Sequence, residues 1–571
     1  MKIAYKYEID DGRQINADEI INILLKSRGI KDKKLFLNPP SPQNISIKDI
    51  DIDLMPQYQK AYMRLIDAHA KGEIIIVYTD YDADGITGGT VLWESLHLMG
   101  FNAMPYVPHR LHEGYGFSQV ALDTIKKEYN PGLIISVDHG ITAVEQVAYA
   151  KKLGIDVIIT DHHLKPEILP NAHAIIHTSL LSGSTVGYFF AKELFKDLKR
   201  NKVLDHTSTT TQLDNHFEND YLAISTIGLI SDMVPLVGIA RATVAAGLTA
   251  FSKVNRIGLT ALLKEAGIEH RKITPYEIGY IIAPRINAAG RLGHAMNALR
   301  LLCTNNPQRA QQLAQGLGEI NIKRQNLLDT ARAEAIELVK QKWGEKLPIL
   351  ITLYNKNWHE GIIGLIASYV AQEFYRPAIV MTDSGSGIKG SARSISGFAI
   401  TDFLKEQKDL LLSVGGHTQA AGFSLERKNL ERFVAKVESE SKNLIKNKDL
   451  EPKMEADFKI PLSMVTIDLA RGLACLEPYG ISNPQPLFYS QGKIVNIKYM
   501  GKKMNHAKII LQAIDNPSNQ LESLLFFHKK NQVQLNSIVD VVYSVEINKW
   551  NHSEKLQGMI KYLCADIVEF P

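Results

Sequence analysis

The sequence predicts an α/β fold built on a parallel sheet, followed along the chain by a smaller α/β region and an all-β region. Three short apolar runs, EIIIVY at 73–78, LIISV at 133–137 and DVIIT at 156–160, alternate with segments of helical periodicity. Near-continuous apolar runs of this length are typical of parallel strands that are buried on both faces. Strands that alternate with helices in this way form βαβ units, which place the strands in one parallel sheet.

The same periodicities divide the remainder of the chain. A long stretch of helical pattern begins after Asn306-Pro307 and carries much polar surface, as helices that bridge domains do. A second run of strands and helices follows, and then short strands with Gly, Asn and Pro turns that predict a small β-barrel. The predicted regions are an N-terminal helical segment at 1–48, the parallel-sheet domain at 49–305, the connecting long helix at 306–345, the smaller α/β domain at 346–445 and the β-barrel at 452–571.

Two stretches, 197–220 and 385–390, do not fit the pattern of alternating strands and helices. Residues 197–220 are polar and charged, and they predict a surface loop or insertion. GSGIKG at 385–390 fits the Gly-rich pattern of dinucleotide-binding loops, but the residues after it look like a strand rather than the required helix. We therefore interpret GSGIKG as a hairpin turn.

Composition restricts the class of protein. A chain of 571 residues is too long for one ordinary core, and its 45% hydrophobic and 22% charged residues are a normal globular mixture. Three distant cysteines, Cys303, Cys475 and Cys564, argue against a disulfide framework or a thiolate zinc site and favour a reducing compartment. The N-terminus has no apolar signal region and no apolar run reaches the ~18 residues of a membrane span, so we expect a cytoplasmic protein without membrane contact. A net charge of +4 is too small to indicate nucleic acid by itself.

Each of the three predicted strands runs directly into acidic residues. In an open α/β sheet, ligands bind at the carboxyl ends of the strands, so we expect these segments to converge. A further acid, Asp232 in GLISDMVPL, lies in the same predicted domain. The residues at the strand ends are Asp80, Asp82 and Asp84 after the first strand, Asp138 after the second, and Asp161, His162 and His163 after the third.

Such a cluster of carboxylates requires bound cations, because the acids cannot ionise side by side without them. Carboxylates with imidazole and no thiolate suit Mn²⁺ or Mg²⁺, and two such ions are the usual apparatus for phosphodiester hydrolysis. The pattern DYDADG also opens calcium-binding loops, but their twelfth position is Glu and here it is Val91. A second alternative is that the aspartates only cap the following helices. His139 is interpreted as a bystander, at the surface or behind the ligands.

The motifs resemble the DHH/DHHA1 phosphoesterase superfamily and, within it, the RecJ family of single-strand-specific DNA exonucleases. Asp161-His162-His163 after an apolar strand, with DYDADG upstream, is similar to the signature of the whole superfamily. APRINAAGRLG at 283–293 and WHEGIIGLIAS at 358–368 are much more specific to the RecJ family. The remaining matches, in chain order, are HRLHEGYGF, SVDHGI, GLISDMVPL, KRQ, KGSARS, GGHTQAAGF and PYGISNPQPLF.

The resemblance implies roles for the acidic residues. One divalent ion would be held by Asp80, Asp82 and Asp138. Asp138 would bridge to a second ion, whose other ligands match Asp84, His162 and Asp232. His163 would contact the scissile phosphate, and Asp161 would orient an imidazole from behind.

The second α/β region resembles the DHHA1 domain. Gly415, Gly416 and His417 would cradle an anion with backbone N–H groups and an imidazole, the alternative being a simple tight turn. Ser391, Arg393 and Ser394 would grip a 5′-phosphate, the alternative being a solvated arginine. Arg285 and Arg291 would line the path of the DNA, or else only brace the interface between the domains.

The β-barrel resembles the oligonucleotide-binding (OB) fold of this family, in which basic grooves and stacked aromatics hold single strands. Tyr499 is a candidate for stacking, and of Phe526 and Phe527 one is expected to point inward. The remaining candidates for DNA contact are Lys498, Lys502, Lys503, Lys508 and Trp550.

The resemblance implies a 5′-to-3′ exonuclease that releases 5′-mononucleotides from single-stranded DNA in recombination and repair. It also implies a single-strand-binding protein as partner, and we expect a monomer. Two departures from the family pattern, His177-Thr178 and LSGSTVGYFF at 181–190, are expected to affect helix packing without touching a metal ligand. The competing interpretations are a phosphatase or pyrophosphatase of the same superfamily, and a replication scaffold that has lost catalysis.

Overall fold

The computed structural model describes residues 2–9, 16–110, 113–114, 116–204, 207–385, 387–446, 450–501, 504–527, 534–550 and 553–565. The chain divides into two compact units, which are described separately. The larger contains Ile3–Asn287, Ala295–Ala314 and Met454–Pro571, and the smaller is formed mainly by Ala288–His294 and Gln315–Lys453.

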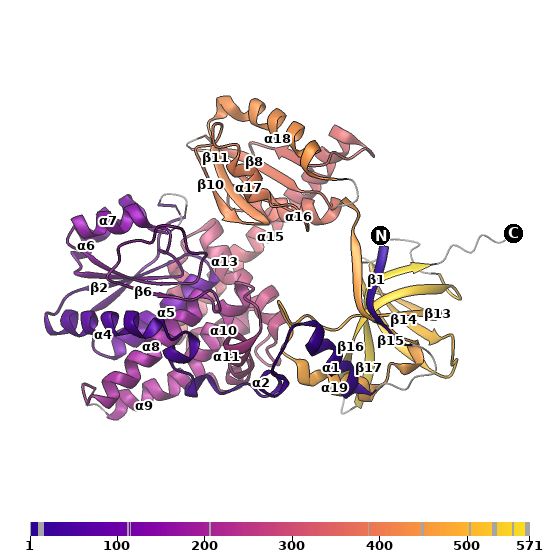
Figure 1. Cartoon of the computed structure of the whole chain (residues 1–571), viewed down its shortest axis with the longest axis horizontal. Coiled ribbons are helices and arrows are strands. Elements are labelled where there is room, and N and C mark those ends of the chain that lie inside the picture. The colour runs from indigo at the N-terminus through magenta and orange to yellow at the C-terminus, as the bar shows by residue number, and fades with distance from the viewer. Residues whose placement is uncertain are drawn as a thin grey trace. The chain divides into compact units, whose positions relative to one another are not determined.

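The larger unit contains the predicted parallel sheet (Figure 1). Its five strands are all parallel and run in the order β3-β2-β4-β5-β6. The apolar runs seen in the sequence form its three central strands, which are buried along nearly their whole length. The strands are β2 (Ile75–Thr79), β3 (Ala103–Tyr106), β4 (Leu133–Val137), β5 (Asp156–Asp161) and β6 (Ala174–His177).

Helices cover both faces of this sheet, which explains why its strands are apolar on both sides. One face packs against α6 and α7 through a core that includes Ile76 and Ile134. In Figure 1 these two helices lie above the sheet, and α4, α5 and α8 lie below it. The bounds are α4 (Leu54–Ala70), α5 (Ala83–Leu98), α6 (Gln119–Tyr129), α7 (Val144–Lys152) and α8 (Gly183–Arg200).

The polar stretch at 197–220 is largely helical, so the prediction of a loop there was wrong. The residues between α8 and α10 (Tyr221–Ser231) include α9 (Thr207–Asn215) and a π-helical turn at His216–Asp220. The helical conformation is stabilised by burial of Leu213 and Phe217, and the Phe217 ring stacks on Phe195. Tertiary packing here overrides the weak helix propensity of the Thr and Asn residues.

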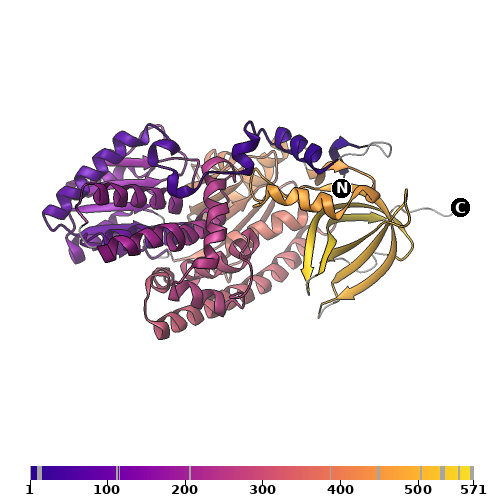
Figure 2. The same cartoon turned by 90° about the horizontal axis from the view of Figure 1, so that it is seen from below.

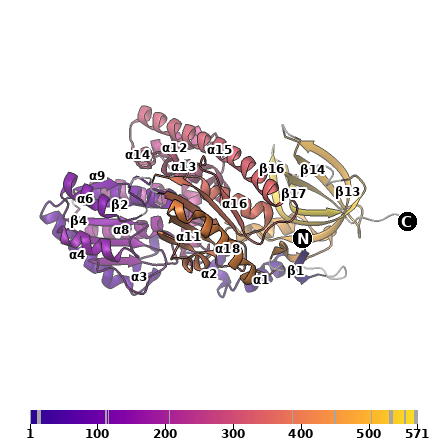
Figure 3. The same cartoon turned by 90° about the horizontal axis from the view of Figure 1, so that it is seen from above.

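The next helices along the chain belong partly to the larger unit and partly to the smaller one. A π-helical turn at Glu277–Ile282 continues directly into α13. The predicted long helix is α15, a single uninterrupted helix in Figure 3. The bounds are α11 (Gly238–Ala250), α12 (Ile257–Glu265), α13 (Ala283–Leu292), α14 (Met296–Cys303) and α15 (Pro307–Trp343).

The smaller unit contains a five-stranded mixed sheet in the order β10-β11-β9-β8-β7. One core joins this sheet to α15 and α16 (Ile363–Phe374), and another joins it to α17 (Ile400–Lys405) and α18 (Leu430–Leu444). Ser384 pairs with Gly387 in an antiparallel hairpin, so the Gly-rich stretch is a hairpin connection as predicted. The strands are β7 (Ile351–Tyr354), β8 (Ala378–Ser384), β9 (Gly387–Arg393), β10 (Ser413–His417) and β11 (Ala420–Leu425).

The C-terminal strands form the predicted barrel (Figure 2). Their order is β1-β12-β13-β14-β15-β17-β16, and an additional pairing of β13 with β16 closes the last five strands into a ring. The first strand of the chain belongs to this sheet, so the N-terminal segment is not helical throughout as predicted. The strands are β1 (Lys2–Glu8), β12 (Lys453–Lys459), β13 (Phe488–Met500), β14 (His506–Ala513), β15 (Gln520–Phe526), β16 (Ile538–Trp550) and β17 (Ser553–Ala565).

A buried arginine ties the barrel to the helical part of the larger unit. Arg241 of α11 donates to the carbonyl oxygens of Phe36, Leu476 and Glu477 at 2.8, 3.1 and 2.8 Å. Its guanidinium also lies over the Phe36 ring, 3.9 Å from the centroid. Within the described residues, no helix combines the length and the apolar character that crossing a membrane requires.

Candidate active site

The acidic segments converge because the strands that carry them are neighbours. Asp80 follows β2 and its N–H donates to Val137 O of β4 at 3.1 Å, while the Asp138 N–H donates to Thr160 O of β5 at 3.0 Å. The hydrogen-bonded ladder therefore extends one residue beyond each strand and holds these acids in register. Asp138 adopts a left-handed backbone conformation with φ 68°, which Asp tolerates better than most residues.

The side chains form three overlapping groups that could hold a metal ion, one of which joins Asp138, His162 and His163. The other two fit a pair of ions. In one group, donor atoms of Asp80, Asp82 and Asp138 lie within 4.8 Å of one another. In the other, His162 Nε2 lies 3.5 Å from Asp232 Oδ2 and 3.9 Å from Asp84 Oδ2. The same nitrogen is 3.1 Å from Asp138 Oδ1. Asp138 thus lies between the two groups, as expected for a bridging ligand.

Several donor atoms of this cluster are buried without any hydrogen-bond partner. They are Asp80 Oδ1, Asp138 Oδ1 and His162 Nε2. Burial and then the charges of the neighbouring aspartates raise the pKa of Asp138 well above its usual range. The same two causes raise the pKa of Asp232 to about 8. Divalent cations satisfy such oxygens and nitrogens and remove the repulsion, so the donor set fits two metal ions.

The N-terminus of α8 supports the cluster, which was not predicted from the sequence. The N–H groups of Gly183 and Ser184 donate to the two carboxylate oxygens of Asp84, at 2.7 and 3.1 Å. A Cβ added to Gly183 would lie 2.4 Å from Asp138 Cβ, so only glycine fits there. LSGSTVGYFF therefore contacts two of the acidic residues, and the prediction that it touches none was wrong. His177, the other departure, donates from Nε2 to His163 O at 2.6 Å.

Asp161 orients His163. Its Oδ1 accepts from His163 Nδ1 at 2.8 Å and from the backbone N–H of His162 at 2.7 Å. Burial by itself would raise the pKa of Asp161, but the bond and charge of His163 outweigh it and the pKa lies well below its usual range. For His163, burial opposes protonation, but Asp161 outweighs it and raises the pKa to about 9. His163 is thereby held as a cation next to the carboxylates.

Two other residues near the acidic loops were not singled out in the sequence, and the structure decides between the two places predicted for a third, His139. Asn287 of α13 accepts from the Ala83 N–H at 2.8 Å and so holds the loop that carries Asp82 and Asp84. Arg110 lies over the Tyr81 ring, 5.0 Å from its centroid. His139 is buried and its Nε2 donates to Tyr78 O at 3.0 Å, so it lies behind the site and not at the surface. Asn287 and Arg110 each stand within a motif that resembles the family, which was the available signal.

In the smaller unit, strand register brings the predicted phosphate-binding residues to one face of the sheet. His417 pairs with Ala420, which pairs with Arg393, and Gly415 pairs with Gly422, which pairs with Ser391. Directly paired residues point to the same side, and so do residues two apart on one strand. Arg393, Ser391 and His417 therefore share a face of the sheet. A Cβ added to Gly415 or Gly422 would meet open space. We call this group, Ser391, Arg393, Gly415 and His417, the sheet face.

Arg393 is held in place on this face. Its Nη1 donates to Ser391 Oγ at 3.1 Å and to Ala392 O at 2.8 Å. Burial lowers the pKa of Arg393, which has no carboxylate partner among the described residues. Gly416 belongs to the β10–β11 hairpin, where a Cβ would lie 2.1 Å from Ala420 O, and its contact with an anion stays a prediction.

Three other residues predicted to contact DNA already have a protein partner within their own unit. Ser394 Oγ donates to Phe398 O at 2.6 Å. Arg285 pairs with Glu265 Oε2 at 2.6 Å, and Arg291 donates to Gly361 O at 3.2 Å. DNA contact by any of these three residues stays a prediction.

The barrel candidates differ in their exposure. Phe526 and Phe527 are 45% and 77% exposed, so the prediction that one of them points inward was wrong. Both rings meet His506 edge-on. Lys508 pairs with Glu522 at 2.6 Å, whereas Lys498 and Tyr499 are exposed. Lys502, Lys503 and the side chain of Trp550 lie outside the described residues.

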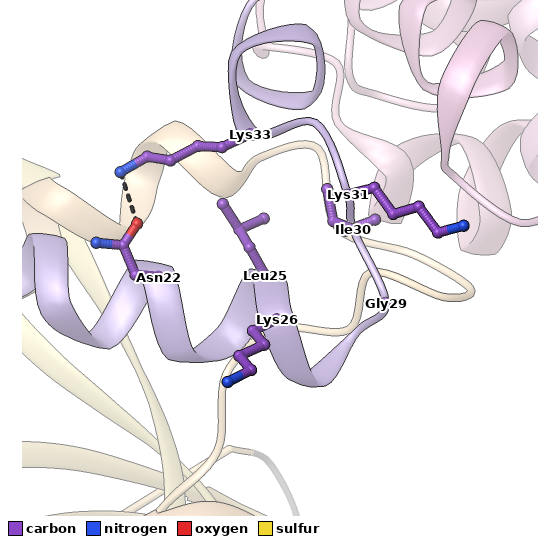
Figure 4. Close-up of a pocket in the computed structure, with 7 residues that line it drawn as sticks. All are labelled: Asn22, Leu25, Lys26, Gly29, Ile30, Lys31 and Lys33. Atoms are coloured by element: carbon purple, nitrogen blue, oxygen red, sulfur yellow. Dashed lines mark hydrogen bonds between the residues drawn. The ribbon is translucent and has the colours of Figure 1, made fainter.

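A hollow on the N-terminal segment is unrelated to these sites (Figure 4). It lies between α1 (Ala17–Ser27) and α2 (Lys33–Leu37), and Lys33 Nζ donates to Asn22 Oδ1 at 2.8 Å across it. Its lining is lysine, asparagine, glycine and aliphatic, without a carboxylate or an imidazole.

Three models of known protein families match successive parts of the chain. The DHH family N-terminal domain matches residues 74–230, the DHHA1 domain matches 347–443, and the RecJ OB domain matches 456–562. The order of these matches follows the parallel sheet, the mixed sheet and the barrel.

Relatives of known description match over nearly the full length. The single-stranded-DNA-specific exonuclease RecJ of Bacillus subtilis (strain 168) is 32% identical, over 96% of this chain and 68% of that protein. The same-named protein of Salmonella typhimurium (strain LT2) is 30% identical, over 87% of this chain and 88% of that one. The crystal structure of RecJ in complex with Mn²⁺ from Thermus thermophilus superposes with a TM-score of 0.78 and 26% identity, covering 98% of this chain and 79% of that one. The chain therefore belongs to the RecJ exonuclease family.

Proposed function

We propose that this protein is a metal-dependent exonuclease that hydrolyses single-stranded DNA from its 5′ end and releases 5′-mononucleotides. The observation that carries the proposal is the buried cluster of Asp80, Asp82, Asp84, Asp138, His162 and Asp232, in which several donor atoms form no hydrogen bond. The relatives' names supply the substrate class, since they are single-stranded-DNA-specific exonucleases.

Two divalent ions, Mn²⁺ or Mg²⁺, would be held by this cluster. One would take Asp80, Asp82 and Asp138, and the other would take Asp84, Asp138, His162 and Asp232. When bound, such a pair stabilises the attacking and leaving oxygens of a phosphodiester displacement.

The chain's own residues would position the scissile phosphate. His163, held as a cation by Asp161, offers a charged N–H donor to a phosphate oxygen. Gly183 and Ser184 keep the Asp84 carboxylate fixed by donating to both its oxygens. Asn287 accepts from the N–H of Ala83, the residue before Asp84, and so fixes the backbone of this loop. Each of these contacts reduces the motion of a charged group near the reacting phosphate.

The sheet face would bind the terminal 5′-phosphate. Arg393 provides a guanidinium that forms no ion pair with the residues the structure describes, Ser391 a hydroxyl and His417 an imidazole, around open space over Gly415. Recognition of the terminal phosphate would impose the 5′-to-3′ polarity, because only one end of a strand carries that group. The loss of this phosphate should therefore weaken binding more than a change of base does.

Partners and location follow from the same proposal. Single-stranded DNA is the substrate, and the barrel would bind the strand beyond the reacting end through Lys498, Tyr499 and the exposed Phe526 and Phe527. A single-strand-binding protein would present such strands in recombination and repair. We further propose that the protein acts as a monomer in the cytoplasm, where its three free cysteines stay reduced.

The direct test is degradation of one oligonucleotide labelled at its 5′ end and another labelled at its 3′ end, with duplex as control, in Mn²⁺, Mg²⁺ and EDTA. We expect immediate release of the 5′ label as mononucleotide, no attack on duplex and no activity in EDTA. Release from the 3′ end, or cleavage of dinucleotides alone, would instead indicate another branch of the superfamily. No cleavage with Mn²⁺ would indicate a scaffold that has lost catalysis.

A further inference from the structure

Two tyrosines form an exposed stacked pair next to α13. Tyr276 and Tyr280 are 60% and 74% exposed, and their rings stack with centroids 5.0 Å apart and planes 29° apart. Single exposed aromatics are ordinary on a protein surface, but two that stack in the open present a continuous aromatic platform. We call this pair the tyrosine platform.

The platform lies on the same helical run that reaches the catalytic loop. The π-helical turn at Glu277–Ile282 continues without interruption into α13, which Figures 1 and 3 label. Seven residues after Tyr280, Asn287 accepts from the Ala83 N–H between Asp82 and Asp84. Seven residues are about two helical turns, or roughly 10 Å along the axis. The tyrosines thus stand a short distance from the carboxylate cluster along one rigid element.

Two exposed cations precede the platform in the chain. Arg271 and Lys272 are exposed, and within the described part of the chain neither has an ion-pair partner. Of the nearby carboxylates, Glu265 pairs with Arg285, Glu269 lies 3.5 Å from His270 Nε2, and Glu277 accepts from the Thr274 hydroxyl and N–H. The local surface therefore combines two aromatic faces with two cations that have no ion-pair partner among the described residues.

This combination favours nucleic acid over a protein partner. Bases stack on aromatic faces irrespective of sequence, and neighbouring cations contact the phosphates. A protein interface of similar size would add aliphatic side chains, yet Tyr276 and Tyr280 are the only large hydrophobic residues that are prominently exposed between 258 and 300, all of which are described.

We propose that bases of the single-stranded substrate stack on Tyr276 and Tyr280 while Arg271 and Lys272 contact its phosphates, about three nucleotides from the scissile bond at ~3.4 Å per stacked nucleotide. The inference rests on the proposed exonuclease function and extends it with a site for the strand that enters the active centre. It makes the platform a binding element for strands longer than about four nucleotides and leaves shorter substrates unaffected.

The test compares three double variants in the full-length protein. Y276A/Y280A removes the rings, Y276L/Y280L keeps apolar bulk without a π-face, and Y276F/Y280F keeps the π-face without the hydroxyl. Each is assayed for KM and kcat on a 20-nucleotide strand and on a 5′-phosphorylated dinucleotide. The dissociation constant for the 20-mer is measured by fluorescence anisotropy in EDTA, where no cleavage occurs. Val120→Ala, an exposed apolar residue of α6, is the matched control.

The Ala and Leu variants are expected to raise the KM and the dissociation constant for the 20-mer by about 10- to 100-fold, with the dinucleotide unaffected. The Phe variant and Val120→Ala should match the wild type. If the wild type cuts the 20-mer and Y276A/Y280A binds it as tightly as the wild type does, the stacking proposal is wrong while the exonuclease proposal stands. Equal losses on both substrates, or wild-type behaviour of the Leu variant, would also overturn stacking. If the wild type itself neither binds nor cuts single strands, the function fails and the platform with it.

Discussion

The carboxylate cluster of the larger unit and the sheet face of the smaller unit are built on opposite principles. The cluster gathers like charges in a buried place, and Asp80, Asp138 and His162 keep atoms without partners. On the sheet face, Arg393 and Ser391 satisfy each other by a hydrogen bond of 3.1 Å. The cluster gathers several like charges and becomes favourable only with cations, whereas the sheet face holds one buried cation on neutral acceptors and awaits an anion.

The comparison teaches that the two sites should respond differently to substitution. Removing a charge from the cluster should relieve repulsion and stabilise the metal-free protein while abolishing catalysis, the trade-off expected of a strained site. Removing a group from the sheet face should change substrate preference with little effect on the chemical step.

The largest effect is expected from Asp138→Asn. The exonuclease rate should fall by roughly a thousandfold or more because a bridging ligand serves both ions. The metal-free protein should unfold about 2–4 °C higher, because Asn avoids both the repulsion of a buried carboxylate and the cost of protonating it. Rates on single strands and thermal unfolding in EDTA measure the two effects. A lower melting temperature, with folding otherwise intact, would show that the repulsion is not as the structure indicates.

Gly183→Ala is expected to come next. The new Cβ would lie 2.4 Å from Asp138 Cβ, so either the start of α8 or Asp138 must move and Asp84 loses its fixed donors. We expect activity to fall by about 10- to 100-fold, with a higher Mn²⁺ requirement, as for other supports of metal ligands. Gly187→Ala is the matched control, since its Cβ would have at least 3.6 Å of room within the same helix. Equal activity of both variants would remove α8 from the site.

Arg393→Ala should reduce the preference for a 5′-phosphate over a 5′-hydroxyl by about tenfold or more, because the guanidinium is the strongest phosphate donor on the sheet face. The maximal rate at saturating substrate should change little. Competition between phosphorylated and unphosphorylated strands measures the preference. Unchanged discrimination would place the 5′-phosphate elsewhere and weaken the comparison between the two sites.

The smallest effect is expected from Ser394→Ala. The Ser394 hydroxyl donates to Phe398 O, so it is not free to bind a phosphate. We expect the 5′-phosphate preference to stay within about twofold of the wild type, since a neutral hydrogen bond is worth about 1 kcal/mol at most sites. A loss as large as that of Arg393→Ala would mean that the loop rearranges around substrate.

Much of the fold could be predicted because the signals are local. The strands that carry Asp80, Asp138 and Asp161 are apolar runs whose ends necessarily meet at one edge of a parallel sheet. The long helix and the barrel were predicted for similar reasons. The helices at 207–220 were not, because Leu213 and Phe217 are buried by distant parts of the chain and their local sequence is polar. β1 was missed because its partner, the barrel sheet, lies at the other end of the sequence.

The site was predicted only as far as its charged residues. Asp84 and Asp138 are visible as acids, but their support from Gly183 depends on a backbone N–H and a missing Cβ, which no side-chain pattern reveals. The sheet face needed strand register, because Arg393 and His417 are brought together across β11. Exposure of Phe526 and Phe527 likewise depends on where the strand ends.

The most direct test of the central claim is the stoichiometry of Mn²⁺ binding to the full-length, metal-free protein, measured by calorimetry and by electron paramagnetic resonance. The account predicts two ions per chain, close enough for their spins to couple, and loss of the coupled pair in Asp138→Asn. A single ion in the wild type, or two coupled ions that persist in Asp138→Asn, would contradict the assignment of Asp138 as the residue that joins two metal sites.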